Sequence, residues 1–195
     1  MNYFLQCQGF GYLLLLIETH LGLFELSFNQ QLLLSTRFTQ FQEIKTLSNV
    51  DLLKKIQLAY PLWEIEFNSC LDFSQTIPTF ITKLARQIKN HLMGDLQNFD
   101  LSCIDKSNWS LFKSSIIDNL CLVKPGSTIS YKRLALNSGF PLAYRACGSV
   151  MAKNNYVLLI PCHRVIKYNC DLGNYSAYAG VITKQKLLNI ENIKL

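Results

Sequence analysis

One cysteine of this 195-residue sequence has neighbours that can make it a nucleophile. Cys162 is the second residue of the pentapeptide Pro-Cys-His-Arg-Val, residues 161–165. It follows the unbroken apolar run 156–160, which predicts a strand that ends at the site. The thiolate is the reactive form of cysteine, and an imidazole and a permanent cation beside the thiol favour that form. The alternative for a cysteine taken alone is a buried structural thiol.

The remaining cysteines have no such neighbours. They are scattered through the chain without a CxxC pair or a zinc-ligand spacing: Cys7, Cys70, Cys103, Cys121, Cys147 and Cys170. We expect most of them to be small buried residues of a protein kept in a reducing cytosol. Cys7, His20 and His91 do not make a convincing set of four ligands, so no structural metal is expected.

Charge divides the chain into two halves. Residues 1–100 hold seven Lys and Arg against nine Asp and Glu, a net charge of −2, whereas residues 101–195 hold twelve against four, a net charge of +8. A basic face attracts polyanions, most often nucleic acid, although a solvated surface that serves solubility is the alternative. No basic segment with a long apolar run follows Met1, so neither a signal peptide nor a membrane helix is expected.

The elements that position these residues begin with a sheet. The runs 12–17 and 23–28 are separated by a turn signal over 18–22, which predicts a hairpin. Residues 63–67 alternate apolar and polar side chains and predict a third strand. A helix is expected over 45–60, where the apolar residues are loosely periodic. The first third of the chain is therefore predicted to form a small α/β layer.

Helices dominate from Pro78 onward. One is predicted from Pro78 to Gly94, with its apolar residues four apart: Phe80, Leu84, Ile88 and Leu92. The polar connection 97–107 is the predicted domain boundary, so the two units are residues 1–100 and 101–195. A further helix is expected over 109–122, with Trp109, Phe112, Ile116 and Leu120 on its buried face.

A pair of short helices precedes the cysteine. Ser130 can cap a helix through Leu136 that Gly139 closes, and Pro141 can start another that runs to about Ala152. This spacing favours a helix-turn-helix, whereas a generic helical hairpin is the alternative. The second helix combines basic residues with small ones, so its surface can approach a nucleic-acid backbone closely.

The pentapeptide at Cys162 is similar to the active-site signature of the O6-alkylguanine-DNA alkyltransferase family, and the resemblance extends over about residues 109–195. It implies an α+β fold, with a small N-terminal α/β lobe that is ribonuclease H-like and a mainly helical C-terminal domain with a winged-helix-like helix-turn-helix. It also implies repair by direct reversal, in which the alkyl group of O6-alkylguanine, or of O4-alkylthymine, moves irreversibly onto Cys162.

The resemblance assigns roles to single residues. Tyr131, in the segment Gly-Ser-Thr-Ile-Ser-Tyr, matches a tyrosine that presses on the phosphate beside the flipped nucleotide, and Arg145 matches the arginine that replaces the extruded base. Asn154, rather than its neighbour Asn155, matches an asparagine that braces the active-site turn. The implied DNA-binding set is Tyr131, Arg145, Ala146, Gly148 and Ser149.

Downstream of the cysteine, residues 173–176 resemble a loop that covers the guanine, and residues 184–191 resemble the closing helix. The implied pocket residues are Met151, Val165, Tyr175 and Ser176. Glu191 matches the carboxylate that orients His163, which acts through a water on Cys162. Tyr131 and the Ser176 amide are then the expected donors to the departing guanine.

The sequence departs from the family pattern in two places. Residues 176–180 are bulkier than the usual Gly-Gly pair and about two residues longer, which bears on pocket shape and on the position of Glu191. Ser149 stands where a second glycine is common.

The expected protein is a single-turnover, monomeric transferase that needs no cofactor or metal. Its expected partner is double-stranded DNA containing O6-alkylguanine. It is not expected to associate with membranes, and its expected location is the cytoplasm, or the nucleus of a eukaryote. One alternative is a lesion sensor that binds alkylguanine without catalysis. A second is a Cys-His hydrolase, which the lack of a glycine-rich oxyanion loop disfavours.

Overall fold

The computed structural model describes residues 2–7, 13–39, 63–68 and 77–194, together with Lys54 and Leu58. Those two single residues are helical, and the rest of the helix predicted over 45–60 lies outside the described residues. No helix within the described ranges is long and apolar enough to span a membrane.

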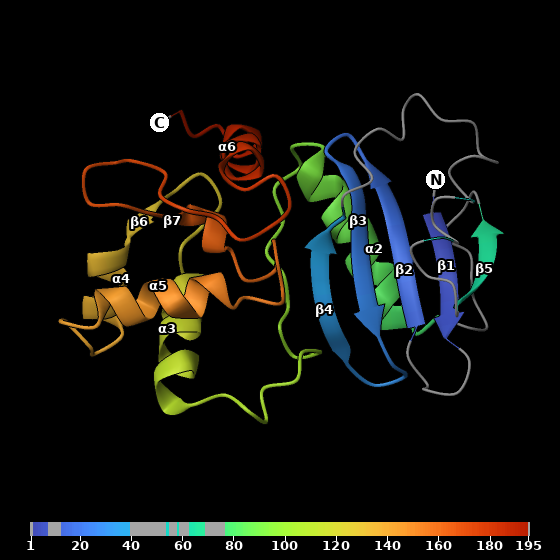
Figure 1. The fold of residues 1–195 in the computed structure, drawn as a ribbon, viewed down its shortest axis with the longest axis horizontal. Coiled ribbons are helices and arrows are strands. Elements are labelled where there is room, and N and C mark those ends of the chain that lie inside the picture. The colour runs from blue at the N-terminus through green and yellow to red at the C-terminus, as the bar shows by residue number, and fades with distance from the viewer. Residues whose placement is uncertain are drawn as a thin grey trace.

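The N-terminal lobe is built on a five-stranded sheet (Figure 1). The order is β4-β3-β2-β1-β5, and every neighbouring pair is antiparallel. The strands are β1 (Asn2–Cys7), β2 (Leu13–Thr19), β3 (Gly22–Phe28), β4 (Leu33–Phe38) and β5 (Trp63–Asn68). The predicted hairpin is confirmed as β2 and β3, and the predicted third strand is confirmed as β5.

The sequence pattern did not reveal β1 and β4. Burial along β4 does not alternate, since Leu33, Thr36 and Phe38 are the buried residues, so the period-2 signal of a strand is missing. What holds β4 is pairing with β3 on one side and contact with the C-terminal half on the other.

Helix α2 (Thr79–Leu92) packs against β2 on one face of the sheet (Figure 1). It confirms the predicted helix, because Leu84, Ile88 and Leu92 are buried. The chain leaves the helix at Gly94, whose φ of +97° favours glycine.

The C-terminal half lies beyond the edge strand β4 (Figure 1). It contains α3 (Leu111–Cys121), α4 (Tyr131–Asn137), α5 (Tyr144–Ala152) and α6 (Val181–Ile190), with a short parallel pair of strands, β6 (Ile129–Ser130) and β7 (Val165–Ile166). Ile116 and Leu120 of α3 are buried as predicted, whereas Trp109 precedes the helix, which Ser110 caps.

Helices α4 and α5 pack against each other. The Ser130 hydroxyl caps α4 as predicted, accepting a hydrogen bond from the Arg133 amide, and Gly139 has a φ of +84° in the turn after the helix. The expected start of the second helix at Pro141 is wrong. The turn continues through residue 143, where the Ala143 amide bonds the Phe140 carbonyl, and α5 begins at Tyr144.

The strand predicted over residues 156–160 is also wrong. Tyr156 and Val157 make isolated bridges, the chain turns at Leu158 with a φ of +75°, and the Ile160 amide returns to the Tyr156 carbonyl at 2.9 Å. All five residues are buried. Their apolar character therefore reflects burial between the two halves of the molecule and not a regular strand.

This buried turn docks onto β4. The Thr36 amide bonds the Asn155 carbonyl at 2.8 Å, the Val157 amide bonds the Thr36 carbonyl at 3.2 Å, and the Thr36 hydroxyl donates to the Val157 carbonyl at 2.7 Å. These backbone contacts tie the segment that leads to Cys162 to the sheet of the N-terminal lobe.

Candidate functional site

Cys162 begins a single 3-10 turn, η2 (Cys162–Arg164), and its side chain is buried. Pro161 precedes it with a ψ of 58°, and the Arg164 amide closes the turn on the Pro161 carbonyl at 2.9 Å. The tight turn separates consecutive side chains: Cys162 lines a cavity, while His163 is fully buried behind it.

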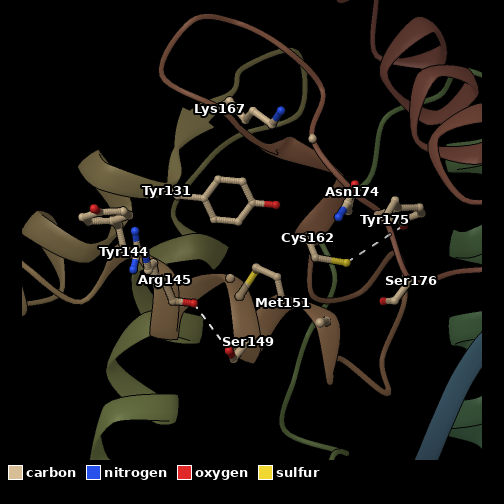
Figure 2. A pocket seen from close by; sticks show the side chains of 13 residues that line it. Tyr131, Tyr144, Arg145, Ser149, Met151, Cys162, Lys167, Asn174, Tyr175 and Ser176 are labelled. Carbon is tan, nitrogen blue, oxygen red and sulfur yellow. Dashed lines mark hydrogen bonds between the residues drawn. The ribbon is translucent and has the colours of Figure 1, made fainter.

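The cavity has a volume of about 590 Å³ and opens beside α4 and α5 (Figure 2). It gathers most of the residues that the sequence assigned to DNA or to the pocket: Tyr131, Arg145, Gly148, Ser149, Met151, Tyr175 and Ser176. Ala146 and Val165 do not line it. Ala146 is exposed on α5, and Val165 is buried with its backbone carbonyl bonded to Lys184.

Asn154 holds the turn and touches the thiol. Its Nδ2 donates to the Ile160 carbonyl at 3.0 Å and lies 3.0 Å from the Cys162 sulfur, and its Oδ1 accepts from the Tyr156 amide at 2.9 Å. The neighbouring Asn155 instead uses its backbone carbonyl to bond β4. The structure thus brings Asn154, and not Asn155, to the cysteine.

The electrostatics of the thiol differ from the sequence expectation. Burial raises the pKa of Cys162, and hydrogen bonding to Asn154 and Tyr175 and the charge of Lys184 act in the opposite direction. The Tyr175 hydroxyl lies 4.0 Å from the sulfur. Arg164, which the sequence offered as the activating cation, turns to Glu191 and the Val123 carbonyl.

Lys184 of α6 is a site residue that the sequence analysis missed. It is fully buried, and its Nζ donates to the Val165 carbonyl at 2.6 Å and to the Leu172 carbonyl. Burial lowers the pKa of Lys184 to about 8, and the Cys162 thiolate acts in the opposite direction. Its only sequence signal is a lysine among apolar residues of a helix, which is common on protein surfaces.

Behind the thiol, Glu191 at the end of α6 is surrounded by donors. Its Oε1 lies 3.0 Å from His163 Nε2, 2.7 Å from Arg164 Nη2 and 3.3 Å from His91 Nε2. Its Oε2 accepts from the Gly126 amide at 3.3 Å. Burial acts to raise the pKa of Glu191, but hydrogen bonds from His163, His91 and Arg164 outweigh it and hold that pKa far below its ordinary value.

His163 is poised as an acceptor. Because Nε2 faces a carboxylate oxygen at 3.0 Å, we assign the proton to Nε2, which leaves a lone pair on Nδ1. Nδ1 is buried and has no hydrogen-bond partner among the described residues. Burial lowers the pKa of His163, and Glu191 only partly offsets this, so the neutral ring is favoured.

Tyr131 and Arg145 stand at the mouth of the cavity. Tyr131 is the first residue of α4, and burial raises the pKa of its hydroxyl, with Cys162 acting in the same direction. Arg145 is exposed in the first turn of α5 (Figure 2). A Cβ on Gly148 would lie 3.9 Å from the Tyr131 ring, an ordinary van der Waals distance, so this ring packs close to α5.

The loop after Tyr175 contributes only Ser176 to the cavity. Ala177 and Tyr178 do not line it and instead face a neighbouring cavity of about 470 Å³ beside β4. The loop also leaves Glu191 in contact with His163. Within the described residues, no group of three or more His, Cys, Asp or Glu side chains could hold a metal ion.

Comparison with known sequences identifies relatives of the site-bearing half. A family model described as "6-O-methylguanine DNA methyltransferase, DNA binding domain" matches residues 111–193. The methylated-DNA–protein-cysteine methyltransferase of Methanosarcina barkeri is 35% identical over 116 residues, which cover 60% of this chain and 71% of that protein. The protein of the same name from Metallosphaera sedula is 34% identical over 127 residues, covering 65% and 78%.

Solved structures extend the likeness to the whole fold. Mycobacterium tuberculosis OGT, in a crystal structure with DNA, matches with a TM-score of 0.63 at 21% identity over 90% of each chain. O6-methylguanine-DNA methyltransferase from Pyrococcus kodakaraensis matches with a TM-score of 0.60 at 22% identity, covering 92% of this chain and 98% of that one. Both halves of the molecule therefore share the mixed α/β fold of these proteins.

Proposed function

The chain belongs to the methylated-DNA–protein-cysteine methyltransferase family, and we propose that it repairs DNA by moving the alkyl group of O6-alkylguanine onto Cys162. The observation that carries this proposal is the position of the thiol. It lies in the wall of a cavity whose mouth is formed by α4 and α5, with a neutral imidazole and a buried carboxylate behind it.

In the proposed complex, α4 and α5 act as a helix-turn-helix against duplex DNA. Arg145, exposed at the mouth, enters the base stack as the alkylguanine rotates into the cavity, and Tyr131 lies against the phosphate beside it. The small residues Ala146, Gly148 and Ser149 let α5 approach the groove. Contacts from the basic half to the backbone make binding salt-sensitive and largely independent of sequence.

The proposed chemistry is a displacement at the alkyl carbon. The lone pair of His163 Nδ1 takes the thiol proton of Cys162 through a bridging water, while Glu191 stabilises the imidazolium that forms. The sulfur then forms a bond to carbon as the carbon–O6 bond breaks. Guanine leaves as an anion that accepts hydrogen bonds from the Tyr131 hydroxyl and the Ser176 amide.

Asn154 and Lys184 stabilise the thiolate in this scheme. The Asn154 amide donates to the sulfur, and the Lys184 charge opposes part of the desolvation that raises the pKa of Cys162. The product is a thioether, which has no tendency to leave near neutral pH, so each molecule reacts once. The transfer as written consumes only the thiol and the lesion.

The N-terminal residues 1–100 are proposed to form a ribonuclease H-like lobe that supports the C-terminal domain, residues 101–195. The protein is proposed to act as a monomer, because one chain holds every residue of the scheme, and to work in the compartment that contains the DNA. Met151 and Tyr175 line the cavity and are the proposed walls for the flipped base.

Intact-protein mass spectrometry after incubation with duplex DNA carrying one O6-methylguanine tests the proposal. We expect the mass to rise by one methyl group that maps to Cys162, at no more than one equivalent per chain. Cys162→Ala is the control, and it is expected to bind the lesion DNA without a change in mass. An unchanged wild-type mass with tight lesion binding would instead identify a lesion sensor, and repeated turnover of an ester would identify a hydrolase.

A further inference from the structure

One contact of the buried cluster comes from the N-terminal lobe. His91 lies in the last turn of α2, the helix that packs on the sheet, and its side chain is 1% exposed. Its Nε2 lies 3.3 Å from Glu191 Oε1, one hundred residues further along the chain. The Phe99 ring packs against the imidazole with a centroid distance of 5.4 Å. The scheme above, on which this inference rests, does not use His91.

The backbone fixes the protonation of His91. The Gln97 amide donates to His91 Nδ1 at 3.0 Å, so Nδ1 must carry a lone pair. The ring hydrogen therefore lies on Nε2, which points at Glu191. His91 is thus a neutral donor, and its bond to the carboxylate requires no proton uptake.

His91 and His163 share one acceptor. The Nε2 atoms of both histidines contact Glu191 Oε1, which also lies 2.7 Å from Arg164 Nη2. Arg164, Glu191 and His91 are the charged or titratable groups in this cluster that act on His163. Each additional donor draws negative charge from Oε1 and weakens the pull of the carboxylate on the His163 proton.

We propose that His91 is a positioning residue for alkyl transfer, through which the N-terminal lobe keeps His163 neutral and its Nδ1 free to act as the base. By occupying Oε1 together with His163, it limits how strongly Glu191 stabilises the imidazolium before reaction. Without His91, the carboxylate binds the His163 proton more tightly, and the base is protonated up to a higher pH.

The pH dependence of single-turnover transfer, at saturating lesion DNA, tests this proposal. In His91→Phe, which keeps the ring volume and removes the donor, we expect the acid limb of the rate profile to move up by about half to one pH unit. Transfer then falls about threefold to tenfold on the acid limb, at pH values below the pKa of His163, with a change of less than about twofold at pH 8.5. A purely structural role would lower the rate equally at all pH values, and that result would overturn the proposal.

His91→Gln is the matched control, because its Nε2 amide can still donate to Glu191. It is expected to keep the wild-type pH profile, whereas a profile like that of His91→Phe would show that ring packing, and not the hydrogen bond, matters. Lesion DNA affinity is expected to stay within about twofold in both variants, because His91 is buried away from the cavity.

Nitrogen-15 NMR of the wild-type imidazoles tests the same proposal without alkyl transfer. We expect His91 to be neutral with its proton on Nε2, and His163 to show a higher pKa in His91→Phe than in wild type. A protonated His91, or an unchanged His163, would contradict the inference even if transfer occurs. Absence of transfer by the wild-type protein would overturn the proposed function. The NMR result would still decide whether His91 lowers the pKa of His163.

Discussion

The two sides of Cys162 are built in opposite ways. On the open side, Arg145 and Ser149 are exposed and Tyr131 is half-buried, all on α4 and α5 around the mouth of the cavity. On the closed side, Glu191 and His163 are at most 1% exposed. The Glu191 carboxylate and His163 Nε2 are hydrogen-bonded, and only His163 Nδ1 lacks a partner among the described residues. The side chains of the open side are therefore accessible to a ligand, whereas the polar groups of Glu191 and His163, apart from His163 Nδ1, are bonded within the protein.

This difference predicts two kinds of mutational effect. A change on the open side alters binding or transfer with little effect on folding, because exposed side chains contribute little to stability. A change on the closed side alters both, because it leaves a buried charge without its partner. The following variants test that division, from the largest expected effect to the smallest.

Glu191→Gln is expected to lower alkyl transfer by a factor of about 100 or more and the free energy of unfolding by about 3–5 kcal/mol. The substitution leaves Arg164 buried without its counter-charge and removes the carboxylate that supports His163. Single-turnover transfer and chemical denaturation measure the two effects. The control is Glu25→Gln, a buried carboxylate of β3 paired with Arg37 at 2.9 Å, neither of which lines the cavity of the thiol, and transfer should be unchanged.

The same carboxylate predicts an acid-sensitive fold. The folded pKa of Glu191 is held below its unfolded value of about 4.3, so its contribution to stability is present above that pH and is lost as the pH falls toward the folded pKa. Denaturation curves between about pH 5 and pH 2 should show a steeper loss of stability for wild type than for Glu191→Gln. Equal slopes would mean that other carboxylates govern acid unfolding.

Arg145→Ala belongs to the open side and is expected to slow transfer about tenfold to thirtyfold, because the extruded base is no longer replaced in the stack. Stability should change by less than about 0.5 kcal/mol, since the side chain is exposed. Fluorescence of 2-aminopurine beside the lesion measures base extrusion directly. Lys153→Ala, exposed just after α5, is the control for a simple loss of charge. Equal effects of the two variants would show that Arg145 contacts only the DNA backbone and does not replace the extruded base.

Lys184→Met is expected to lower transfer about tenfold at neutral pH, because the cation that opposes desolvation of the Cys162 thiolate is removed. The loss should shrink as the pH rises, since hydroxide then ionises the thiol. Lys186→Met, exposed on the same helix, is the control. A loss of transfer that does not depend on pH would show that Lys184 has a structural role and does not stabilise the thiolate.

Stability gives Lys184 a second signature. Its folded pKa of about 8 lies below the unfolded value of about 10.4, so the folded state releases its proton first. Wild-type stability should gain from this group as the pH rises from about 8 to 10, and Lys184→Met should lack that gain.

Ser149→Gly is the smallest change. Restoring the glycine that is common in the family removes an exposed hydroxyl that donates to the Arg145 carbonyl at 3.4 Å. Lesion DNA affinity should rise by no more than about twofold, and the helix should lose up to about 1 kcal/mol of stability. Fluorescence anisotropy and thermal unfolding measure the two quantities. A large gain in affinity would show that Ser149 obstructs the groove.

Residues close together in sequence were predictable because their structure is local. Ser130 caps α4, Gly139 takes a positive φ after it, and the β2–β3 hairpin follows from two apolar runs and a turn. The prediction of a strand over residues 156–160 was wrong because the structure of this run depends on contacts with distant parts of the chain. Apolar composition reports burial, and a buried turn with Leu158 in a left-handed conformation has the same composition as a buried strand.

By itself, the sequence determined the family and most of the helices around the cavity, and it predicted the nucleophile, because a distinctive pentapeptide and local patterns encode them. Only the tertiary structure decided how the site is charged. It turned Arg164 from the thiol to Glu191, buried Lys184 against the Val165 and Leu172 carbonyls, and brought His91 from the other lobe. Electrostatic interactions depend on distance and burial, and for residues far apart in the chain only the folded structure sets both.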